Sequence, residues 1–91
     1  MPEAVIAGTV FRPPGLALEG AEVTITPQEG EKPKKLKTVT NFRGEFAVRV
    51  PAVPMKYSVD VKAAGFKLDQ KTVAIEGEQS RELSFLLEAA K

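Results

Sequence analysis

The sequence predicts an all-β fold, a seven-stranded antiparallel Greek-key β-sandwich. Seven short segments alternate apolar and polar residues with a period of two, and clusters rich in Gly, Pro and Glu separate them. This pattern is typical of sandwiches and barrels, in which each strand buries one face and exposes the other. No segment has the length and period of a helix. The tail from 86 to 91 is too short for a stable helix, and we expect it to fray.

The expected strands cover residues 5–11, 21–26, 36–40, 45–50, 57–63, 71–76 and 82–87. Successive side chains of a β-strand point to opposite sides of the sheet, so the alternation assigns two faces to each strand. The inward residues expected to form the core are Ile6, Val10, Val23, Ile25, Phe46, Val48, Val50, Tyr57, Val59, Val61, Val73, Ile75, Leu83, Phe85 and Leu87. The outward faces are expected to carry Thr24, Glu45, Arg49, Asp60, Lys62 and Ser84.

The segment TNFRGEF, residues 40 to 46, predicts a β-hairpin between the third and fourth expected strands. Asn41 suits the first position of a type I turn, because its side chain accepts a hydrogen bond from the backbone two residues on. Gly44 suits the left-handed conformation that follows such a turn. We therefore expect a positive φ at Gly44, with Phe46 resuming the alternation on a strand paired to the one before the turn.

The length of 91 residues predicts one domain, residues 1–91, with its folded core from about 5 to 87. The 13 basic and 12 acidic residues leave a net charge of +1, which gives no general attraction to nucleic acid or to a membrane surface. No apolar stretch has the length that crosses a bilayer, and the first residues carry no signal-peptide pattern. We expect an isolated domain that is monomeric, binds no nucleic acid and does not insert into a membrane.

The side-chain chemistry disfavours an enzyme. The chain has no histidine and no cysteine, so Ser/His/Asp and Cys/His arrangements cannot form, and zinc would have only carboxylates to bind it. The carboxylates are scattered over loops and outward positions, and the turns at Glu29/Glu31 and Glu76/Glu78 lack the dense ligand spacing of calcium loops. We expect no catalytic residue, no bound metal and no cofactor.

Two surface features are candidates for binding a partner. Four lysines lie close together before the third expected strand: Lys32, Lys34, Lys35 and Lys37. This lysine segment fits either an anionic or protein partner or a solvated loop whose lysines protect a strand edge. The second feature is Phe42, which the turn places at an exposed tip, where it either anchors a partner or packs onto a neighbouring loop.

The order and spacing of several motifs resemble the carboxypeptidase regulatory-like domain: Gly8-Thr9-Val10, Gly15, Leu18, Gly20-Ala21, Val23, Thr40-Asn41-x-x-Gly44-x-Phe46, Tyr57-x-Val59-x-Val61 and Gly65-Phe66. The resemblance implies a transthyretin-like, immunoglobulin-like β-sandwich that serves as an accessory module of exported bacterial proteins. Tyr57 is similar to the tyrosine at sandwich corners, whose ring packs inside and whose hydroxyl bonds to nearby backbone.

The favoured hypothesis is therefore a non-enzymatic accessory, spacer or protein-interaction module of a larger exported bacterial protein, located in the periplasm, at the cell surface or outside the cell. Its partners would be another protein or neighbouring domains of the same chain. The alternative is a free-standing binding protein that uses the lysine segment or a strand edge to hold an anionic or protein partner. The pilin and adhesin domains with a Lys–Asn cross-link are not expected, because the first lysine is Lys32 and Asn41 is in a turn.

Overall fold

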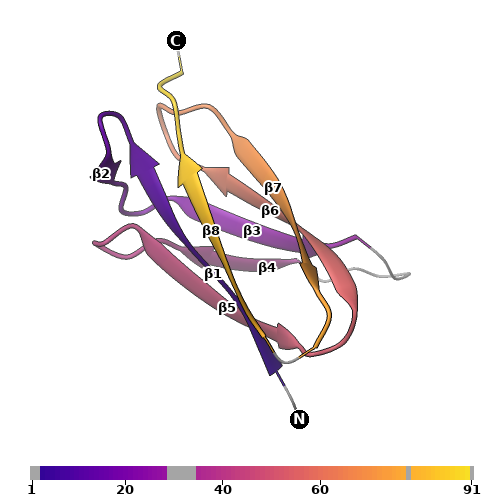
Figure 1. Cartoon of the computed structure of the whole chain (residues 1–91). Helices are drawn as coiled ribbons and strands as arrows, with labels where there is room; N and C mark the ends of the chain where they lie inside the picture. Colours follow the sequence, from indigo (N-terminus) through magenta and orange to yellow (C-terminus); the bar gives the residue numbers. More distant parts are fainter. Residues whose placement is uncertain (1–2, 29–34, 78, 91) are drawn as a thin grey trace.

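The computed structural model describes residues 3–28, 35–77 and 79–90, and within them the chain forms two β-sheets packed as a sandwich (Figure 1). The strands are β1 (Glu3–Arg12), β2 (Leu16–Ala17), β3 (Glu22–Pro27), β4 (Leu36–Val39), β5 (Glu45–Pro51), β6 (Met55–Lys62), β7 (Asp69–Ile75) and β8 (Ser80–Leu86). The predicted all-β sandwich is confirmed. The strand that the sequence does not predict is β2, two residues that pair with the end of β1.

The first sheet has β1 at its centre, with β5 and β2 paired to it and β8 on the other side, and the second sheet has the order β4-β3-β6-β7. Every pair is antiparallel except β1 with β8, which is parallel from Val5↔Ser80 to Phe11↔Leu86. This pair departs from the purely antiparallel arrangement that we predicted. It arises because the chain leaves β7 in the second sheet and enters β8 at the same end of the molecule where β1 begins (Figure 1).

The predicted hairpin between the third and fourth expected strands is wrong. β4 pairs with β3 and β5 pairs with β1, so the turn between them passes from one sheet to the other. The physical reason lies at Thr40, which is only 3% exposed. Its hydroxyl donates to the Leu18 carbonyl oxygen (2.6 Å) and accepts from the Ala21 N–H (2.9 Å), which ties the end of β4 to the loop before β3.

The local turn itself forms as predicted. The Gly44 N–H donates to the Asn41 carbonyl oxygen at 2.9 Å, and the Asn41 side-chain oxygen accepts from the N–H groups of Arg43 and Glu45. The φ of Gly44 is +74°, which confirms the left-handed conformation. The conformation of the turn is therefore predictable from these few residues, whereas contacts elsewhere in the fold determine which strand each flanking strand pairs with.

The predicted core is confirmed for all but two of its inward residues, because Val48 and Leu83 are half-buried. The sequence did not single out Ala4, which is fully buried. Of the predicted outward residues, Thr24 and Asp60 are half-buried and the others are exposed. The rings of Phe46 and Phe85 lie 6.3 Å apart between the sheets, in the tilted arrangement that aromatic pairs favour.

The described part of the C-terminal tail does not fray. Ala89 bridges to Phe66, the Lys67 N–H donates to the Glu88 carbonyl oxygen (2.8 Å), and the Ala90 N–H donates to the Gly65 carbonyl oxygen (2.9 Å). The expectation was wrong because it considered only helix formation, while the loop before β7 offers backbone groups that the tail can pair with. Within the described ranges no helix is long and apolar enough to cross a membrane.

Candidate functional site

The structure describes only part of the predicted lysine segment. Lys32 and Lys34 lie outside the described residues, whereas Lys35 and Lys37 are described and exposed. Lys37 lies on β4, which pairs on one side only, with β3. A charged side chain on an edge strand discourages pairing with other chains. The described lysines therefore fit the edge-protecting role as well as a binding role.

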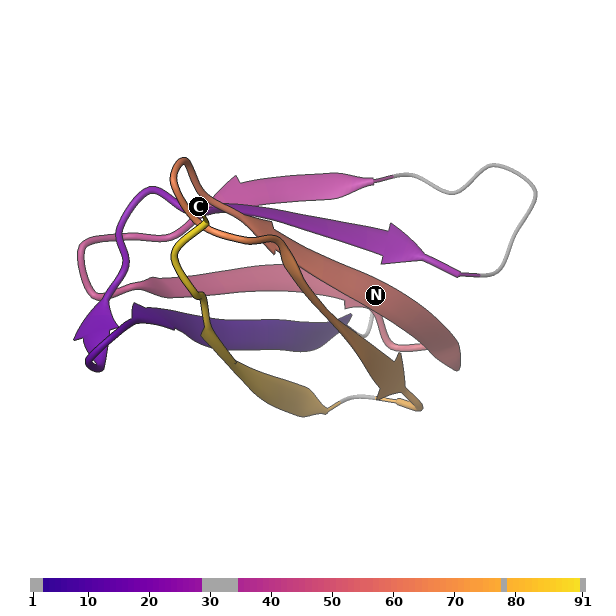
Figure 2. The same ribbon diagram turned by 90° about the horizontal axis from the view of Figure 1, so that it is seen from above.

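Phe42 is exposed, as predicted, with 71% of its surface accessible. The Arg43 guanidinium carbon lies 5.4 Å from the centre of its ring, within the range of a cation–π contact. Lys35 precedes β4 and Phe42 follows it, and the four residues of β4 span about 13 Å. The two ends of β4 face opposite ends of the sandwich (Figure 2), so Phe42 and Lys35 lie on two separate surfaces rather than in one site.

On one side of the sandwich, the gap between the edge strands β7 and β8 is bridged by two long basic side chains, Lys71 and Arg81. The Lys71 ammonium donates to the Ser84 carbonyl oxygen and lies 5.3 Å from the centre of the Phe85 ring. The Arg81 side chain donates to the Ala74 carbonyl oxygen at 3.2 Å. Each bond links the edge strand of one sheet to that of the other, so two edge carbonyl groups on this side already have partners.

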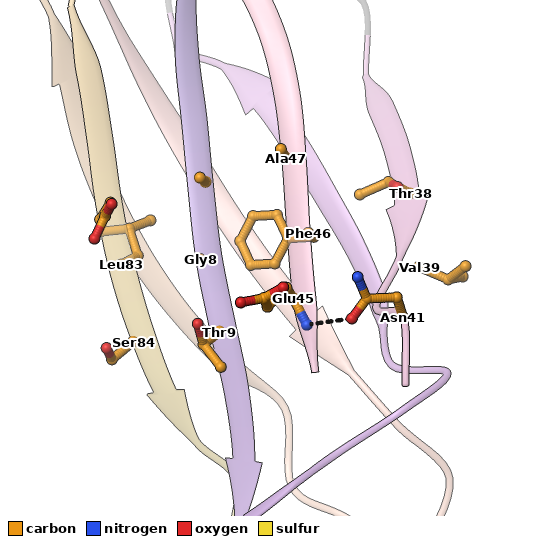
Figure 3. Close-up of a pocket in the computed structure, with 12 residues that line it drawn as sticks. Gly8, Thr9, Thr38, Val39, Asn41, Glu45, Phe46, Ala47, Leu83 and Ser84 are labelled. Atoms are coloured by element: carbon orange, nitrogen blue, oxygen red, sulfur yellow. Dashed lines mark hydrogen bonds between the residues drawn. The ribbon is translucent and has the colours of Figure 1, made fainter. Parts of the chain in front are cut away.

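The other open side, between β4 and β5, has a different character. The two strands diverge from the turn at Asn41, and an open hollow of about 710 Å³ extends from β4 over β5 and across the first sheet (Figure 3). Its lining includes the small side chains Ala7, Thr9, Ala47 and Ser84, the carboxylates Glu45 and Glu82, and Thr38, Val39 and Asn41 next to β5.

The hollow is acidic. Glu45 and Glu82 are both exposed on the outward face of the first sheet, and the lining contains no lysine and no arginine. Thr9, Thr38 and Ser84 add hydroxyl groups that both donate and accept hydrogen bonds. These groups are suited to hold a polar or positively charged partner.

The described residues contain no group of three or more His, Cys, Asp or Glu side chains placed to hold a metal ion. The titratable group with a clear perturbation is Tyr57, whose ring is buried and whose pKa is raised by desolvation. Among the described residues nothing hydrogen-bonds its hydroxyl, so the backbone contact implied by the sandwich-corner resemblance is not seen there. Tyr57 lies on β6 and is not part of the hollow.

The sequence did not reveal the hollow because the predicted hairpin would have placed β4 along β5 and covered it. The sequence carried no clear signal of it, because the expected strands 36–40 and 45–50 are nearly equal in length. In the structure β4 has four residues and β5 has seven, so β4 is too short to cover the whole of β5.

The profile of the carboxypeptidase regulatory-like domain matches residues 5–88 of the chain. The chain belongs to this family. Its members are small accessory β-sandwich modules, which agrees with the two sheets described above. No curated protein sequence matches the chain.

Solved structures with a similar fold come from larger proteins. The dioxygenase domain of a dioxygenase and carbohydrate-binding fusion from Streptomyces sp. SirexAA-E has a TM-score of 0.75 and 14% identity over 98% of this chain and 81% of its own. The 3-chlorocatechol 1,2-dioxygenase from Rhodococcus opacus 1CP has a TM-score of 0.76 and 11% identity, and the match covers 98% of this chain and 61% of the dioxygenase chain. The Bacillus anthracis TIE protein has a TM-score of 0.77 and 18% identity, and the match covers 98% of this chain and 17% of the TIE chain. At these identities the likeness shows the fold alone.

Proposed function

We propose that the regulatory-like domain is a non-enzymatic accessory module that acts as a spacer and protein-interaction unit in a larger exported bacterial protein. The observation that carries this proposal is that the described chain begins and ends at opposite ends of an elongated sandwich (Figure 1). The molecule measures 40 × 24 × 16 Å. A domain of this shape holds whatever is joined to its two ends apart by its long axis.

The interior supports a structural role rather than a catalytic one. The space between the sheets is filled by branched and aromatic side chains, and the most buried of the larger ones are Phe85, Ile6, Ile25, Ile75 and Leu87. Small-molecule sites are usually concave and enclosed, whereas the hollow at β5 is open. The fold shared with dioxygenases brings no activity with it, because fold does not imply function.

The spacer role is tested by joining a fluorescent donor before residue 3 and an acceptor after residue 90, with one, two or three copies of the domain between them. Each folded copy is expected to add up to its long dimension of 40 Å, so that energy transfer falls stepwise. The control is a Gly/Ser linker of equal residue number, whose average span grows only with the square root of its length. A distance that follows the linker control would contradict the spacer role.

The absence of catalysis is tested separately with 3-chlorocatechol, which the name of one structural neighbour contains. We expect no turnover of it by the purified domain, with or without added divalent metal salts. Any product that increases with protein concentration and disappears on heat denaturation would contradict a non-enzymatic role.

The reading frame that encodes the chain is expected to extend beyond it and to carry an export signal, since a module works as part of a longer protein.

A further inference from the structure

We propose that the free edge of β5 binds an extended peptide segment of a partner protein, rich in lysine or arginine, by adding it as a strand to the first sheet. This inference rests on the proposed interaction role and names the site and the partner's chemistry. It is independent of the spacer role, which needs no bound peptide. Strand addition uses backbone hydrogen bonds for affinity and alternate side chains for specificity.

The backbone groups available on β5 follow from its pairing. The Gly44 carbonyl oxygen accepts from the Val10 N–H on β1 at 2.7 Å, and the register continues through Gly8↔Phe46 and Ile6↔Val48. In an antiparallel pair successive residues direct their N–H and C=O groups to opposite sides. The groups of Phe46 and Val48 therefore face β1. Those of Glu45, Ala47 and Arg49, which alternate with them, face away.

Asn41 marks the beginning of this free edge. Its N–H donates to the Glu45 carbonyl oxygen, and its side-chain oxygen accepts from the Glu45 N–H, both at 3.0 Å. The next outward-facing backbone groups are those of Ala47 and Arg49, and β5 has no partner strand on this side. These two N–H and two C=O groups, called here the β5 edge, can form a ladder of four hydrogen bonds.

The side chains around the β5 edge leave room for a strand. On the outward face Ala47 and Thr9 are small and partly or fully exposed, so the Ala47 position is open, and the longer exposed side chains of Glu45 and Arg49 flank it on β5. On the inner face Val48 and Leu36 are half-buried and pack against the core, so their remaining exposed surface would be covered by apolar side chains of the added strand. The segment that fits therefore alternates apolar residues, directed inward, with polar ones directed outward.

Charge selects the polar residues of that segment. Glu45 and Glu82 line the hollow, and no lysine or arginine lines it with them. Arg49 belongs to the β5 edge and carries a positive charge, and its exposed side chain is 3.8 Å from the exposed Glu3 carboxylate. A positively charged side chain of the added strand is therefore placed beside Glu45, where it meets complementary charge, and not beside Arg49, because opposite charges on neighbouring strands stabilise pairing and like charges do not.

The other edges are less suited to the same segment. On β7 and β8 the carbonyl groups of Ala74 and Ser84 already accept hydrogen bonds from Arg81 and Lys71. On β4 the exposed Lys37 would repel a basic segment. Of β4, β5, β7 and β8, it is β5 that combines unpaired backbone groups with the acidic hollow and a small side chain at Ala47.

The test is an NMR titration of the isotope-labelled domain with an eight-residue peptide of alternating lysine and valine, blocked at both ends. We expect chemical-shift changes centred on Ala47 and Arg49 and slower hydrogen exchange of their amides in the complex. Two matched peptides separate the contributions: one has glutamate in place of lysine, and the other carries N-methyl groups on alternate residues, which remove backbone donors. Each is expected to bind at least about tenfold more weakly.

Protein variants provide the second arm. Ala47→Pro removes one edge N–H at a position where the ring faces solvent, and it is expected to abolish binding, whereas Ala47→Val keeps the N–H and the binding. If Ala47→Pro does not fold, the N-methylated peptide decides the question with the unmodified domain. Glu45→Lys is expected to weaken the lysine peptide and to strengthen the glutamate peptide.

Several results would overturn the proposal. They are equal binding of the lysine and glutamate peptides, shift changes centred on Lys37 or Thr72 instead of Ala47, and no binding at millimolar peptide. Concentration-dependent changes at Ala47 without peptide would assign the edge to a second copy of the chain and would also overturn it. The energy-transfer experiment contains no peptide, so failure of this inference and failure of the spacer role are observed separately.

Discussion

Phe46 packs its ring over Gly8, its register partner on β1, at the position that a side chain would occupy. A Cβ atom built on Gly8 would lie 2.6 Å from two ring atoms of Phe46 and 2.9 Å from the Leu83 carbonyl oxygen. Real Cβ atoms do not approach other atoms so closely, and the Leu83 backbone cannot move aside as a flexible side chain can. Glycine at this position therefore lets three strands of the first sheet meet around a buried aromatic ring.

Gly8→Ala is expected to destabilise the domain by about 1–3 kcal/mol, the usual cost of inserting a methyl group into a filled core. Chemical denaturation followed by circular dichroism measures the change. The matched control is Gly77→Ala, because a Cβ at Gly77 meets nothing within 4 Å and its φ is not positive. Equal stability of the two variants would show that Phe46 has another low-energy position.

A second prediction separates the cost of backbone strain from the cost of a steric clash when Gly44 in the turn is replaced by alanine. Gly44 has a φ of +74°, and an added Cβ would lie 2.5 Å from the Val10 carbonyl oxygen, whereas Gly20 has a φ of +82° with open space around it. Gly20→Ala is expected to cost about 1 kcal/mol from the left-handed backbone alone. Gly44→Ala is expected to cost clearly more in the same unfolding experiment, because backbone strain and the steric clash add. A smaller effect at Gly44 than at Gly20 would contradict the packing around the turn.

The Thr40 hydroxyl provides a third prediction, because it holds the end of β4 against the loop before β3. Thr40→Val keeps the shape of the side chain and leaves the Ala21 N–H and the Leu18 carbonyl oxygen without this partner. We expect a loss of about 1–3 kcal/mol. Thr40→Ser retains the hydroxyl and should restore much of the stability, which a purely steric effect would not do.

Thr40 also shows which features of the fold the sequence predicts and which it does not. Apolar alternation identified every strand except β2 and nearly all of the core, because burial of one strand face depends on residue type and spacing within the segment. The end of β4 is held beside the loop before β3 by the buried Thr40 hydroxyl and its partners Leu18 and Ala21, some twenty positions away, and no local pattern contains this contact. The hairpin was predicted from the turn, and the turn formed, yet its strands entered different sheets.

In the candidate site, too, local features were predictable and features that depend on distant contacts were not. The exposure of Phe42 was predictable, because a residue at the tip of a four-residue turn has few neighbours. The hollow and the β5 edge were not, because both exist only where β4 and β5 diverge. Their chemistry depends on Glu45 and Glu82, which come from strands that are distant in the sequence and lie on either side of β1.

A fourth prediction concerns pH. Burial raises the pKa of Tyr57 above its usual value of 10.0. The unfolded chain then releases this proton at a lower pH than the folded one, so the contribution to stability is complete below pH 10 and declines as pH rises towards the folded pKa. Tyr57→Phe cannot ionise and is expected to lose less stability between pH 9 and pH 11. Lysine titration is common to both proteins and cancels in the difference. Parallel stability curves would contradict the desolvation of Tyr57 in the folded domain.

The final prediction distinguishes the exposed surfaces from the core and from the β5 edge. Phe42→Ser is expected to change the free energy of unfolding by less than about 0.5 kcal/mol, because the ring is 71% exposed, whereas Phe46→Ala should cost about 3–5 kcal/mol. The same small effect is expected when serine replaces Lys32, Lys34, Lys35 and Lys37 together.

These stable variants then test partner contact in pull-down experiments against the parent domain and Ala47→Pro. If Phe42 or the lysine segment anchors the partner, its serine variant retains less of that partner while remaining folded. If both serine variants retain the partner and Ala47→Pro does not, the contact lies on the β5 edge. Retention by all three would exclude these surfaces, because each variant removes the defining group of its surface: an aromatic ring, four positive charges or a backbone donor.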